Sequence, residues 1–252
     1  MHLTVQALVL RVTPYKDTDA ILTLLSRSHG KITAKARGLR RKNNPMAAAC
    51  QLLAYGEYTL FEYNGYYTVN EAQSIELFKE LQKDLINLTL GTYFVQVADV
   101  ISQEDYPNPE LLSLVLNSLY ALTKLDVPAQ RVKSVFEMRC ACIAGYQPDL
   151  HGCYRCNNPI PDRFNIAEGH LECAGCRDTT SDGIRIPITP GTVDALRYIC
   201  FCDPQKLFAF QAGEETLNCL SQVSECYLSV QLERGFSALD FYNALQVQVH
   251  DY

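Results

Sequence analysis

The chain has 252 residues, of which 48% are hydrophobic and 20% are charged. This composition is sufficient for a buried core and argues against a disordered chain. The first residues lack the basic and apolar regions of a signal peptide, and no segment approaches the roughly 18 apolar residues of a membrane-spanning helix, so we expect a cytoplasmic protein without membrane contact.

The formal net charge of −6 is distributed unevenly along the chain. Residues 1–50 carry nine basic and two acidic side chains, a net charge of +7, which leaves −13 for the rest of the chain. This asymmetry indicates that one part of the chain contacts a polyanion, such as a nucleic acid, and that the other part does not.

Residues 1–80 show the short apolar runs and turn signals of β-strands. Strands are predicted at 5–10, 20–25, 32–36, 55–63 and 66–74. The last two flank Asn64-Gly65, which is the strongest short-range hairpin signal. Five short strands, with a helix possible only at 45–53, predict a small closed barrel of the OB type rather than an open sheet with helices on its faces.

From about residue 77 the hydrophobic period changes to about 3.6, which is typical of helices. One predicted helix face carries Leu81, Leu85, Leu88, Thr92 and Val95, and a neighbouring face carries Leu90, Phe94, Val97 and Ile101. Further helices are predicted at about 110–125, 128–145, 190–200, 213–232 and 237–245, with Thr189 as a cap and Gly145 as a stop signal. Because the first three helices are joined by short loops, we expect them to pack on one another as a bundle.

The fold class predicted from these patterns is α+β with more than one domain. We expect an OB-type DNA-binding barrel at 1–80, and an α-helical domain at 81–252 with an insertion at about 150–180.

The eleven cysteines are an odd number in a chain too large to need a disulfide framework, so a reducing compartment fits them best. Four of them form two C-x-x-C pairs. We interpret the other seven as small buried hydrophobic residues. They are Cys50, Cys140, Cys142, Cys200, Cys202, Cys219 and Cys226.

The two cysteine pairs have the spacing C-x2-C-x16-C-x2-C, which lies within the range of zinc sites. Their members are Cys153, Cys156, Cys173 and Cys176. Four thiolates at ~2.3 Å from the ion complete a tetrahedron, so we predict one structural Zn2+ held in a short hairpin. Four protein ligands leave no open coordination position for catalysis.

Other uses of four cysteines stay open as alternatives. They are two disulfides, a thioredoxin-like redox pair and an iron–sulfur cluster. A redox motif needs one pair beside a strand–helix–strand pattern, which the sequence lacks. His151 and His170 are interpreted as exposed loop residues, although either could replace a displaced cysteine ligand.

The segment 35–45 is basic and carries no acidic side chain. Such a run can be a solvated loop, but six aromatic residues follow it on the predicted strands 55–63 and 66–74. A cationic loop beside barrel aromatics binds a phosphate backbone and stacks unpaired bases, although about half of these rings must face the core. The candidate DNA-binding residues are Arg11, Lys16, Lys31, Lys35, Arg37, Arg40, Arg41 and Lys42.

The sequence contains no phosphate-binding P-loop, no serine-hydrolase motif and no zinc-protease motif, which favours a binding protein over an enzyme. Two alternatives remain. One is a nuclease or other nucleic-acid enzyme that is stabilised by zinc. The other is a protein-interaction adaptor whose basic loop only aids solubility.

Five short segments carry a resemblance over essentially the full length of the chain. They are YKDTDAILTLLS at 15–26, Gly30-Lys31, ARGLRR at 36–41, GYQPDL at 145–150 before the first cysteine pair, and Gly169 before the second pair. In this order and spacing the chain resembles the bacterial DNA repair and recombination mediator family RecO. Where that family tends to have Gly-Gly, this chain has Gly169-His170, which affects the local turn.

The resemblance implies a function in DNA repair and recombination. Members of the family bind single- and double-stranded DNA, anneal complementary strands, and work with RecR to load RecA onto DNA that is covered by single-strand binding protein (SSB). The resemblance also implies a nucleoid-associated bacterial protein without catalytic residues, whose helical domain captures the acidic C-terminal tail of SSB. Some members lack the cysteines, which agrees with a structural metal.

Overall fold

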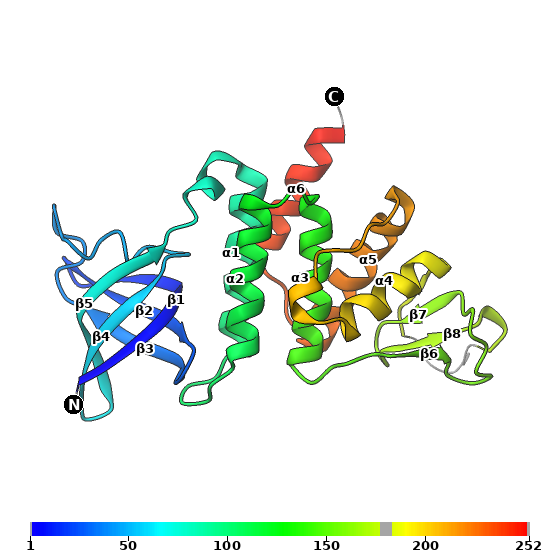
Figure 1. Ribbon diagram of the computed structural model, residues 1–252, viewed down its shortest axis with the longest axis horizontal. Helices are drawn as coiled ribbons and strands as arrows, with labels where there is room; N and C mark the ends of the chain where they lie inside the picture. The colour runs from blue at the N-terminus through cyan, green and yellow to red at the C-terminus, as the bar shows by residue number, and fades with distance from the viewer. Residues whose placement is uncertain (1, 177–182, 251–252) are drawn as a thin grey trace. The chain divides into compact units, whose positions relative to one another are not determined.

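Two compact units make up the chain. The structure is a computed structural model that describes residues 2–176 and 183–250 (Figure 1). The first unit, here called the barrel unit, consists of Met1–Thr123 and Phe236–Tyr252, and the second, the cysteine unit, consists of Lys124–Gly235. Within the described ranges, every helix is too short or too polar to cross a bilayer.

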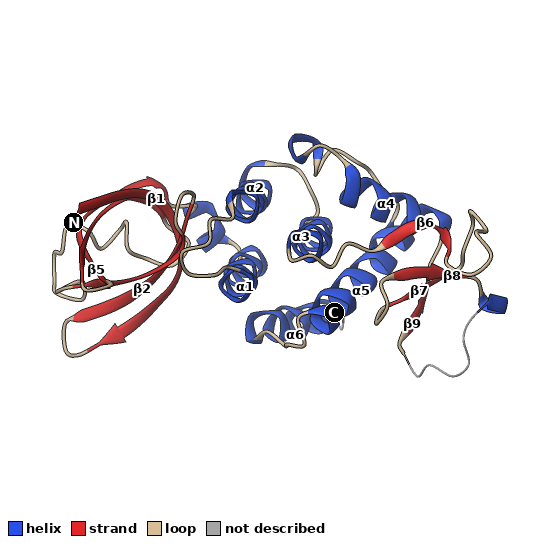
Figure 2. Cartoon of the chain, turned by 90° about the horizontal axis from the view of Figure 1, so that it is seen from below, coloured by secondary structure: helices blue, strands red, loops and turns tan. Residues whose placement is uncertain are grey.

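Five strands close into a barrel, as predicted. They are β1 (His2–Tyr15), β2 (Asp19–Ser26), β3 (Gly30–Ala36), β4 (Tyr55–Tyr63) and β5 (Tyr66–Glu76), in the spatial order β1-β2-β3-β5-β4. Neighbouring strands are antiparallel except for β3 and β5, where Ala34 lies opposite Tyr67 in a parallel pair. Figure 2 shows these strands curving into a closed ring, and the prediction of an OB-like barrel is confirmed.

The barrel interior is filled by the inward-facing side chains of each strand. Along β3, Ile32 and Ala34 are buried while Thr33 between them is exposed. The interior cluster includes Val5, Val9, Leu22, Leu24, Ile32, Tyr58 and Leu60. The one polar atom that Tyr58 brings into the core is satisfied, because its hydroxyl donates to the Ala49 carbonyl at 2.6 Å.

The segment 45–53 forms successive turns instead of the helix that the sequence allowed. The chain shortly before it and at its end is held in conformations that a helix cannot use, since Asn43 and Leu53 have φ angles of 62° and 68°. The segment is also bound to β1: the Leu53 N–H donates to the Val9 carbonyl at 3.1 Å, and the Val9 N–H donates to the Ala54 carbonyl at 2.9 Å. Backbone hydrogen bonds to the barrel therefore replace those of a helix.

Three helices complete the barrel unit: α1 (Leu85–Ile101), α2 (Pro109–Lys124) and α6 (Ser237–His250). A short 3-10 turn, η1 (Lys79–Lys83), precedes α1. The Asp84 carboxylate caps α1 by accepting from the Asn87 N–H at 3.0 Å. Helix α1 packs closely at Gly91, where a Cβ would lie 3.2 Å from the side chain of Leu119 in α2 and that side chain would have to shift slightly.

Helix α1 begins later than the sequence predicted, and part of its expected buried face is open. Phe78 has a φ of 45°, a left-handed conformation that prevents a continuous α-helix from starting near residue 77. Leu85, which was expected on the buried face, is 55% exposed, whereas Leu90 and Phe94 on the neighbouring face are fully buried. Leu85 and Phe241 of α6 instead line a groove of about 310 Å³.

The cysteine unit combines three helices with a small sheet. The helices are α3 (Ala129–Ile143), α4 (Pro190–Phe201) and α5 (Glu214–Gln231), with a 3-10 turn, η3 (Pro204–Lys206), after α4. The sheet has the order β6-β8-β7-β9, with β6 (Asp149–Cys153), β7 (Arg163–Asn165), β8 (His170–Glu172) and β9 (Arg185–Pro187). Helix α3 was expected to pack with the two helices before it, but it belongs to this second unit with α4 and α5. The predicted cap is present, since Thr189 Oγ1 accepts from the Thr192 N–H at 3.2 Å.

Buried charges join α3 to α5. The side chains of Lys133 and Glu137 are fully buried, and the Lys133 ammonium lies 3.0 Å from Glu137 and 2.7 Å from Glu225. The Ser224 hydroxyl donates to Glu137 at 2.6 Å. Because each charge has partners, the cluster tolerates burial and links the two helices.

Candidate nucleic-acid interface and metal centre

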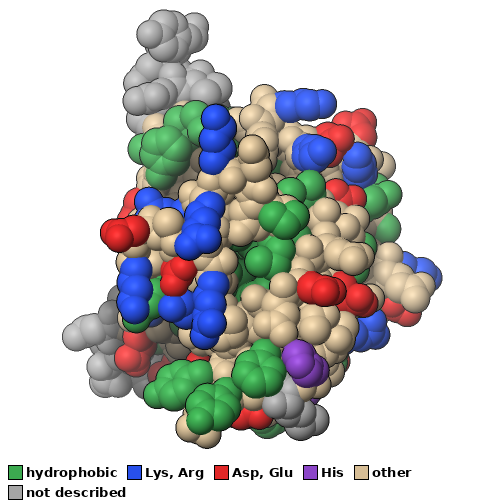
Figure 3. Space-filling model, turned by 90° about the vertical axis from the view of Figure 1, so that its left-hand side faces the viewer, with side chains coloured by type: hydrophobic (Ala, Val, Ile, Leu, Met, Phe, Trp, Pro, Cys, Tyr) green, Lys and Arg blue, Asp and Glu red, His purple; other side chains and the backbone are tan. Residues whose placement is uncertain are grey.

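The basic loop after β3 presents exposed cations on the barrel. Arg37, Arg40, Arg41 and Lys42 are exposed, as is Lys16 in the turn between β1 and β2. Among the described residues, these five form no ion pair with a carboxylate. Figure 3, which faces the barrel, shows lysine and arginine side chains gathered along one side of this surface with a few acidic ones between them.

The loop is anchored by Asp19 at the start of β2. One oxygen of its carboxylate accepts from the Gly38 N–H at 2.8 Å, and the other lies 2.8 Å from the Lys35 ammonium. The hydrogen bond from Lys35 and that from Gly38 lower the pKa of Asp19 to about 2. The Arg40 N–H also donates to the Thr18 carbonyl at 2.9 Å. The loop therefore holds its arginines in a defined place, and composition alone did not reveal Asp19 as its anchor.

Three of the eight predicted DNA-binding residues are already paired with the protein's own carboxylates. Lys35 binds Asp19, while Arg11 and Lys31 each lie 3.3 Å from the carboxylate of Asp99 in α1. Lys31 also donates to the Asp99 carbonyl at 2.7 Å. These three cations are therefore less available to phosphates than the five exposed ones.

The four cysteines of the two C-x-x-C pairs converge in the cysteine unit. Their sulfur atoms all lie within 4.8 Å of one another, and those of Cys156 and Cys173 are 3.9 Å apart. Zinc bonds of ~2.3 Å in a tetrahedron place the sulfurs ~3.8 Å apart, so the donor set fits a tetrahedral ion. Cys153 ends β6, and Cys176 ends the 3-10 turn η2 (Ala174–Cys176) that follows β8.

Two of the four thiols differ strongly in acidity. Burial raises the pKa of Cys153, but the backbone N–H groups of Cys156, Arg155 and Cys173 lower it by more, so that it falls to about 6. A hydrogen bond to the sulfur of Cys156 is the main cause that raises the pKa of Cys176 to about 12. Neighbouring thiolates repel one another, so all four can ionise together only around a positive ion.

Backbone and side-chain hydrogen bonds hold the two cysteine turns in place. The Cys153 N–H donates to the Asn158 carbonyl at 2.8 Å, and the Asn158 side chain donates to the Cys173 sulfur at 3.2 Å. The Cys173 N–H donates to the Cys153 sulfur at 3.3 Å. One asparagine thus connects the first turn to the second, as outer ligand-orienting residues do in metal sites.

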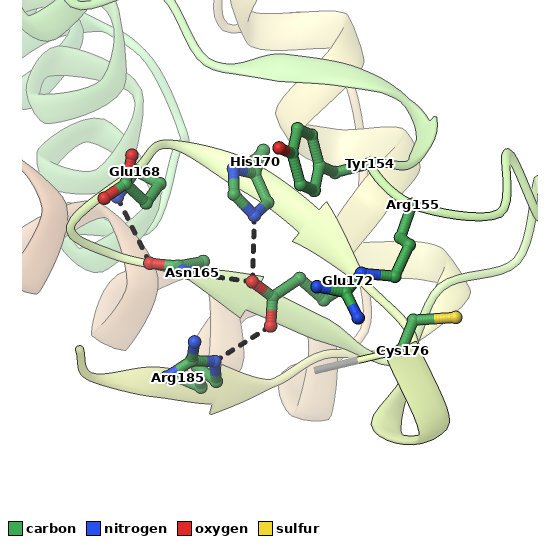
Figure 4. Close-up of a pocket in the computed structure, with 8 residues that line it drawn as sticks. All are labelled: Tyr154, Arg155, Asn165, Glu168, His170, Glu172, Cys176 and Arg185. Atoms are coloured by element: carbon green, nitrogen blue, oxygen red, sulfur yellow. Dashed lines mark hydrogen bonds and ion pairs between the residues drawn. The ribbon is translucent and has the colours of Figure 1, made fainter. Parts of the chain in front are cut away.

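A polar network on one face of the sheet, where it lines a pocket, supports the segment that carries the third cysteine (Figure 4). Glu172, next to Cys173, accepts from Asn165 and His170 through one oxygen and from Arg185 through the other, each at 2.8 Å. These bonds connect β7, β8 and β9. Burial raises the pKa of Glu172, but the three donors outweigh it and leave the pKa below its usual value.

His170 is not the exposed loop residue that we predicted, whereas the side chain of His151 is exposed. The side chain of His170 is only 14% exposed, because it lies in β8, bonds to Glu172 and stacks on the Tyr154 ring at 4.3 Å. The histidine that stands where the family tends to have a second glycine therefore gives Glu172 a largely buried hydrogen-bond partner. Gly169 before it is required, since its φ is 66° and a Cβ would lie 2.5 Å from the Tyr227 hydroxyl.

All eleven cysteines are described, and each is a free thiol, which excludes the alternative of two disulfides in this structure. The interpretation of the other seven as buried holds for Cys50, Cys140 and Cys200. Cys142, Cys202, Cys219 and Cys226 are half-buried. These four lie on or next to helices, whose partly covered faces a sequence pattern does not separate from fully covered ones.

Two family models cover nearly the whole chain. The model of the N-terminal part of recombination protein O matches residues 1–78, and that of its C-terminal part matches residues 82–240. The chain belongs to the RecO family. A DNA repair protein RecO of Acetivibrio thermocellus is 32% identical over 246 residues, which are 97% of each chain. The RecO protein of Bacillus subtilis is 30% identical over 88% of this chain and 86% of the relative.

Membership in the RecO family agrees with the resemblance inferred from the sequence. The basic loop and the four-cysteine cluster both lie in parts of the chain that match this family. The RecO protein of Alkaliphilus metalliredigens, at 27% identity, also extends over 95% of this chain. The N-terminal RecO model covers the barrel with its basic loop, and the C-terminal model covers the four-cysteine cluster.

Proposed function

We propose that this RecO-family chain is a non-catalytic recombination mediator of the RecF pathway. It binds single- and double-stranded DNA, anneals complementary strands, and together with RecR helps to load RecA onto SSB-coated DNA in the bacterial cytoplasm, at the nucleoid. DNA binding is assigned to residues 1–80, and the contacts with RecR and the SSB tail to residues 81–252. The partner assignments rest on the family.

One observation carries the DNA-binding part. The basic loop places Arg37, Arg40, Arg41 and Lys42 on the barrel surface without carboxylate partners among the described residues, and Asp19 fixes the loop that presents them. Ordered cations that are free of ion pairs neutralise phosphates without first breaking an internal contact. Binding by such a loop is independent of sequence and depends steeply on salt.

The test reverses the charge of three loop residues, Arg37→Glu, Arg40→Glu and Arg41→Glu. We expect loss of DNA affinity and a log–log salt dependence that is shallower by about 0.7 to 0.9 for each lost phosphate contact. A matched variant reverses Lys83, Lys206 and Arg234, which are exposed outside the barrel and change the net charge equally. Equal affinity and salt dependence in both variants would contradict the assignment.

The mediator activity is tested with complementary labelled strands, with and without SSB. We expect duplex formation that the loop variant loses, and intact strands in the presence of magnesium. Magnesium-dependent cleavage would favour the nuclease alternative instead, and the absence of DNA binding at low salt would favour the adaptor.

We further propose that the ion of the four-cysteine cluster is one structural Zn2+ bound by Cys153, Cys156, Cys173 and Cys176. The supporting observation is the closed set of four sulfur donors, because soft thiolates in a tetrahedral arrangement select zinc over magnesium or calcium. The ion would hold together the two turns at the end of the small sheet, and would take no part in DNA chemistry.

A further inference from the structure

Three aromatic side chains are exposed together on the β4–β5 hairpin. Phe61 is 39% exposed, Tyr63 is 67% exposed and Tyr66 is 80% exposed, whereas Tyr58 of the same hairpin is fully buried. Large aromatic rings in water lose the free energy of burial, so a group of them marks a contact surface. Figure 3 shows hydrophobic side chains gathered at one end of the barrel face that also carries the basic side chains.

The strand register places these rings on one outer face. Tyr63 pairs with Tyr66 across the hairpin, and Phe61 pairs with Thr68. Because strand side chains alternate, Phe61 and Tyr63 point to the same side of β4, and Tyr58 points to the core. On the neighbouring strand β1, His2 lies opposite Phe61, and the centroids of the two rings are 5.3 Å apart.

The parallel pairing of β3 with β5 brings a cation into the same row. Lys35 lies opposite Thr68, which in turn lies opposite Phe61, so Lys35 and Phe61 are two strands apart, or about 10 Å. The Lys35 ammonium is 5.0 Å from the centre of the exposed Tyr15 ring. A row of cation and aromatic side chains thus crosses the barrel from Tyr15 to Phe61, and the basic loop begins directly after β3.

We infer that this outer face of β3, β5 and β4 is a stacking platform for the unpaired bases of a single-stranded nucleic acid. Phe61, Tyr63 and Tyr66 contact the bases, while the basic loop holds the phosphates. The exposed cations of the basic loop, which follows β3 on the same barrel, select a polyanion, and a single strand is the polyanion that exposes aromatic faces. The inference rests on the proposed DNA binding, and it adds which aromatic side chains contact the bases of a single strand.

The experiment compares three oligonucleotides of equal length: a deoxythymidine strand, a strand of abasic sites and a blunt duplex. For Phe61→Ala, Tyr63→Ala and Tyr66→Ala we expect a loss of affinity for the thymidine strand of roughly 5- to 150-fold per stacked base. Affinity for the abasic strand and the duplex stays within about twofold, and the salt dependence is unchanged because no phosphate contact is removed.

Two further variants separate stacking from other effects. Tyr66→Phe keeps the ring and retains wild-type affinity for the thymidine strand. Tyr120→Ala removes a tyrosine that is exposed on α2, outside the barrel, and also retains that affinity. Thermal midpoints of all variants equal to that of the wild type show that the barrel remains folded, as expected for exposed positions.

Three results would overturn the platform. The first is wild-type affinity for the thymidine strand in the combined alanine variant, while reversal of the loop arginines abolishes binding; the proposed DNA binding then stands without the platform. The second is an equal loss on thymidine and abasic strands. The third is a change of oligomeric state in the alanine variants, which would assign the rings to a protein contact. If the wild type binds no strand, the proposed function fails first.

Discussion

The barrel and the four-cysteine sheet are both small β structures, but different interactions stabilise them. The barrel has strands of seven to fourteen residues and a continuous apolar interior. In the sheet of the cysteine unit, β7, β8 and β9 have three residues each. One face carries the buried Phe164, Leu171 and Ile186, and the other carries Glu172 with its donors. Strands this short bury less apolar surface than those of the barrel, so the polar contacts of Glu172 and the proposed zinc ion have a larger share in holding this sheet together.

The largest expected effect follows from removing one proposed metal ligand. Cys153→Ser should lose the single ion and unfold the sheet around β6 and β8 while the barrel stays folded, because structural zinc contributes about 10 to 16 kcal/mol in small zinc peptides. The metal content per chain measures loss of the ion, and protease cleavage within 149–187 measures unfolding of the sheet. Cys202→Ser, which changes a half-buried thiol outside the cluster, should retain the ion. One ion per chain in Cys153→Ser would contradict the ligand set.

A smaller effect is expected from a cavity in the barrel. Leu22→Ala removes a fully buried side chain and should destabilise the barrel by about 2 to 5 kcal/mol without loss of metal. Hydrogen exchange of the β2 amides measures the change in opening free energy. Ile21→Ala, on the same strand but half-buried, should cost less. A loss of metal in Leu22→Ala would show that the four-cysteine cluster depends on the barrel core, contrary to the comparison above.

The smallest expected effect concerns the anchor of the basic loop. In the folded protein the pKa of Asp19 is lowered to about 2, below its unfolded value of about 3.9, so its stabilising contribution is complete above about pH 4 and disappears as the pH falls to about 2. Asp19→Asn should therefore lower the thermal midpoint slightly at neutral pH. The difference from the wild type should vanish between about pH 4 and pH 2. A difference that is constant over this range would show that the carboxylate charge is not the anchor.

The sequence predicted local features well. Alternation, the Asn64-Gly65 turn and the cysteine spacing all depend on neighbouring residues, and the barrel strands and the four-cysteine cluster appear where they were expected. The predicted domain boundary near residue 80 and the eight DNA-binding residues stay predictions.

Features that depend on distant residues were missed. The pairing of Arg11 and Lys31 with Asp99 joins positions far apart in the sequence, as does the parallel contact of β3 with β5. Periodicity places Leu85 on an apolar face, but it does not show whether another element covers that face. In a strand as short as β8, alternation is too brief to place His170, whose burial depends on Glu172 and Tyr154.

Asp99 binds cations from two different strands of the barrel, Arg11 of β1 and Lys31 of β3, and it stands near the end of α1. The Lys31 N–H also donates to the Gln103 carbonyl at 2.9 Å, just after that helix. A rotation of the barrel against α1 would have to break these contacts at the same time. A probe attached to the exposed side of α1 should therefore report the tumbling of the barrel itself when a long DNA strand binds and slows it.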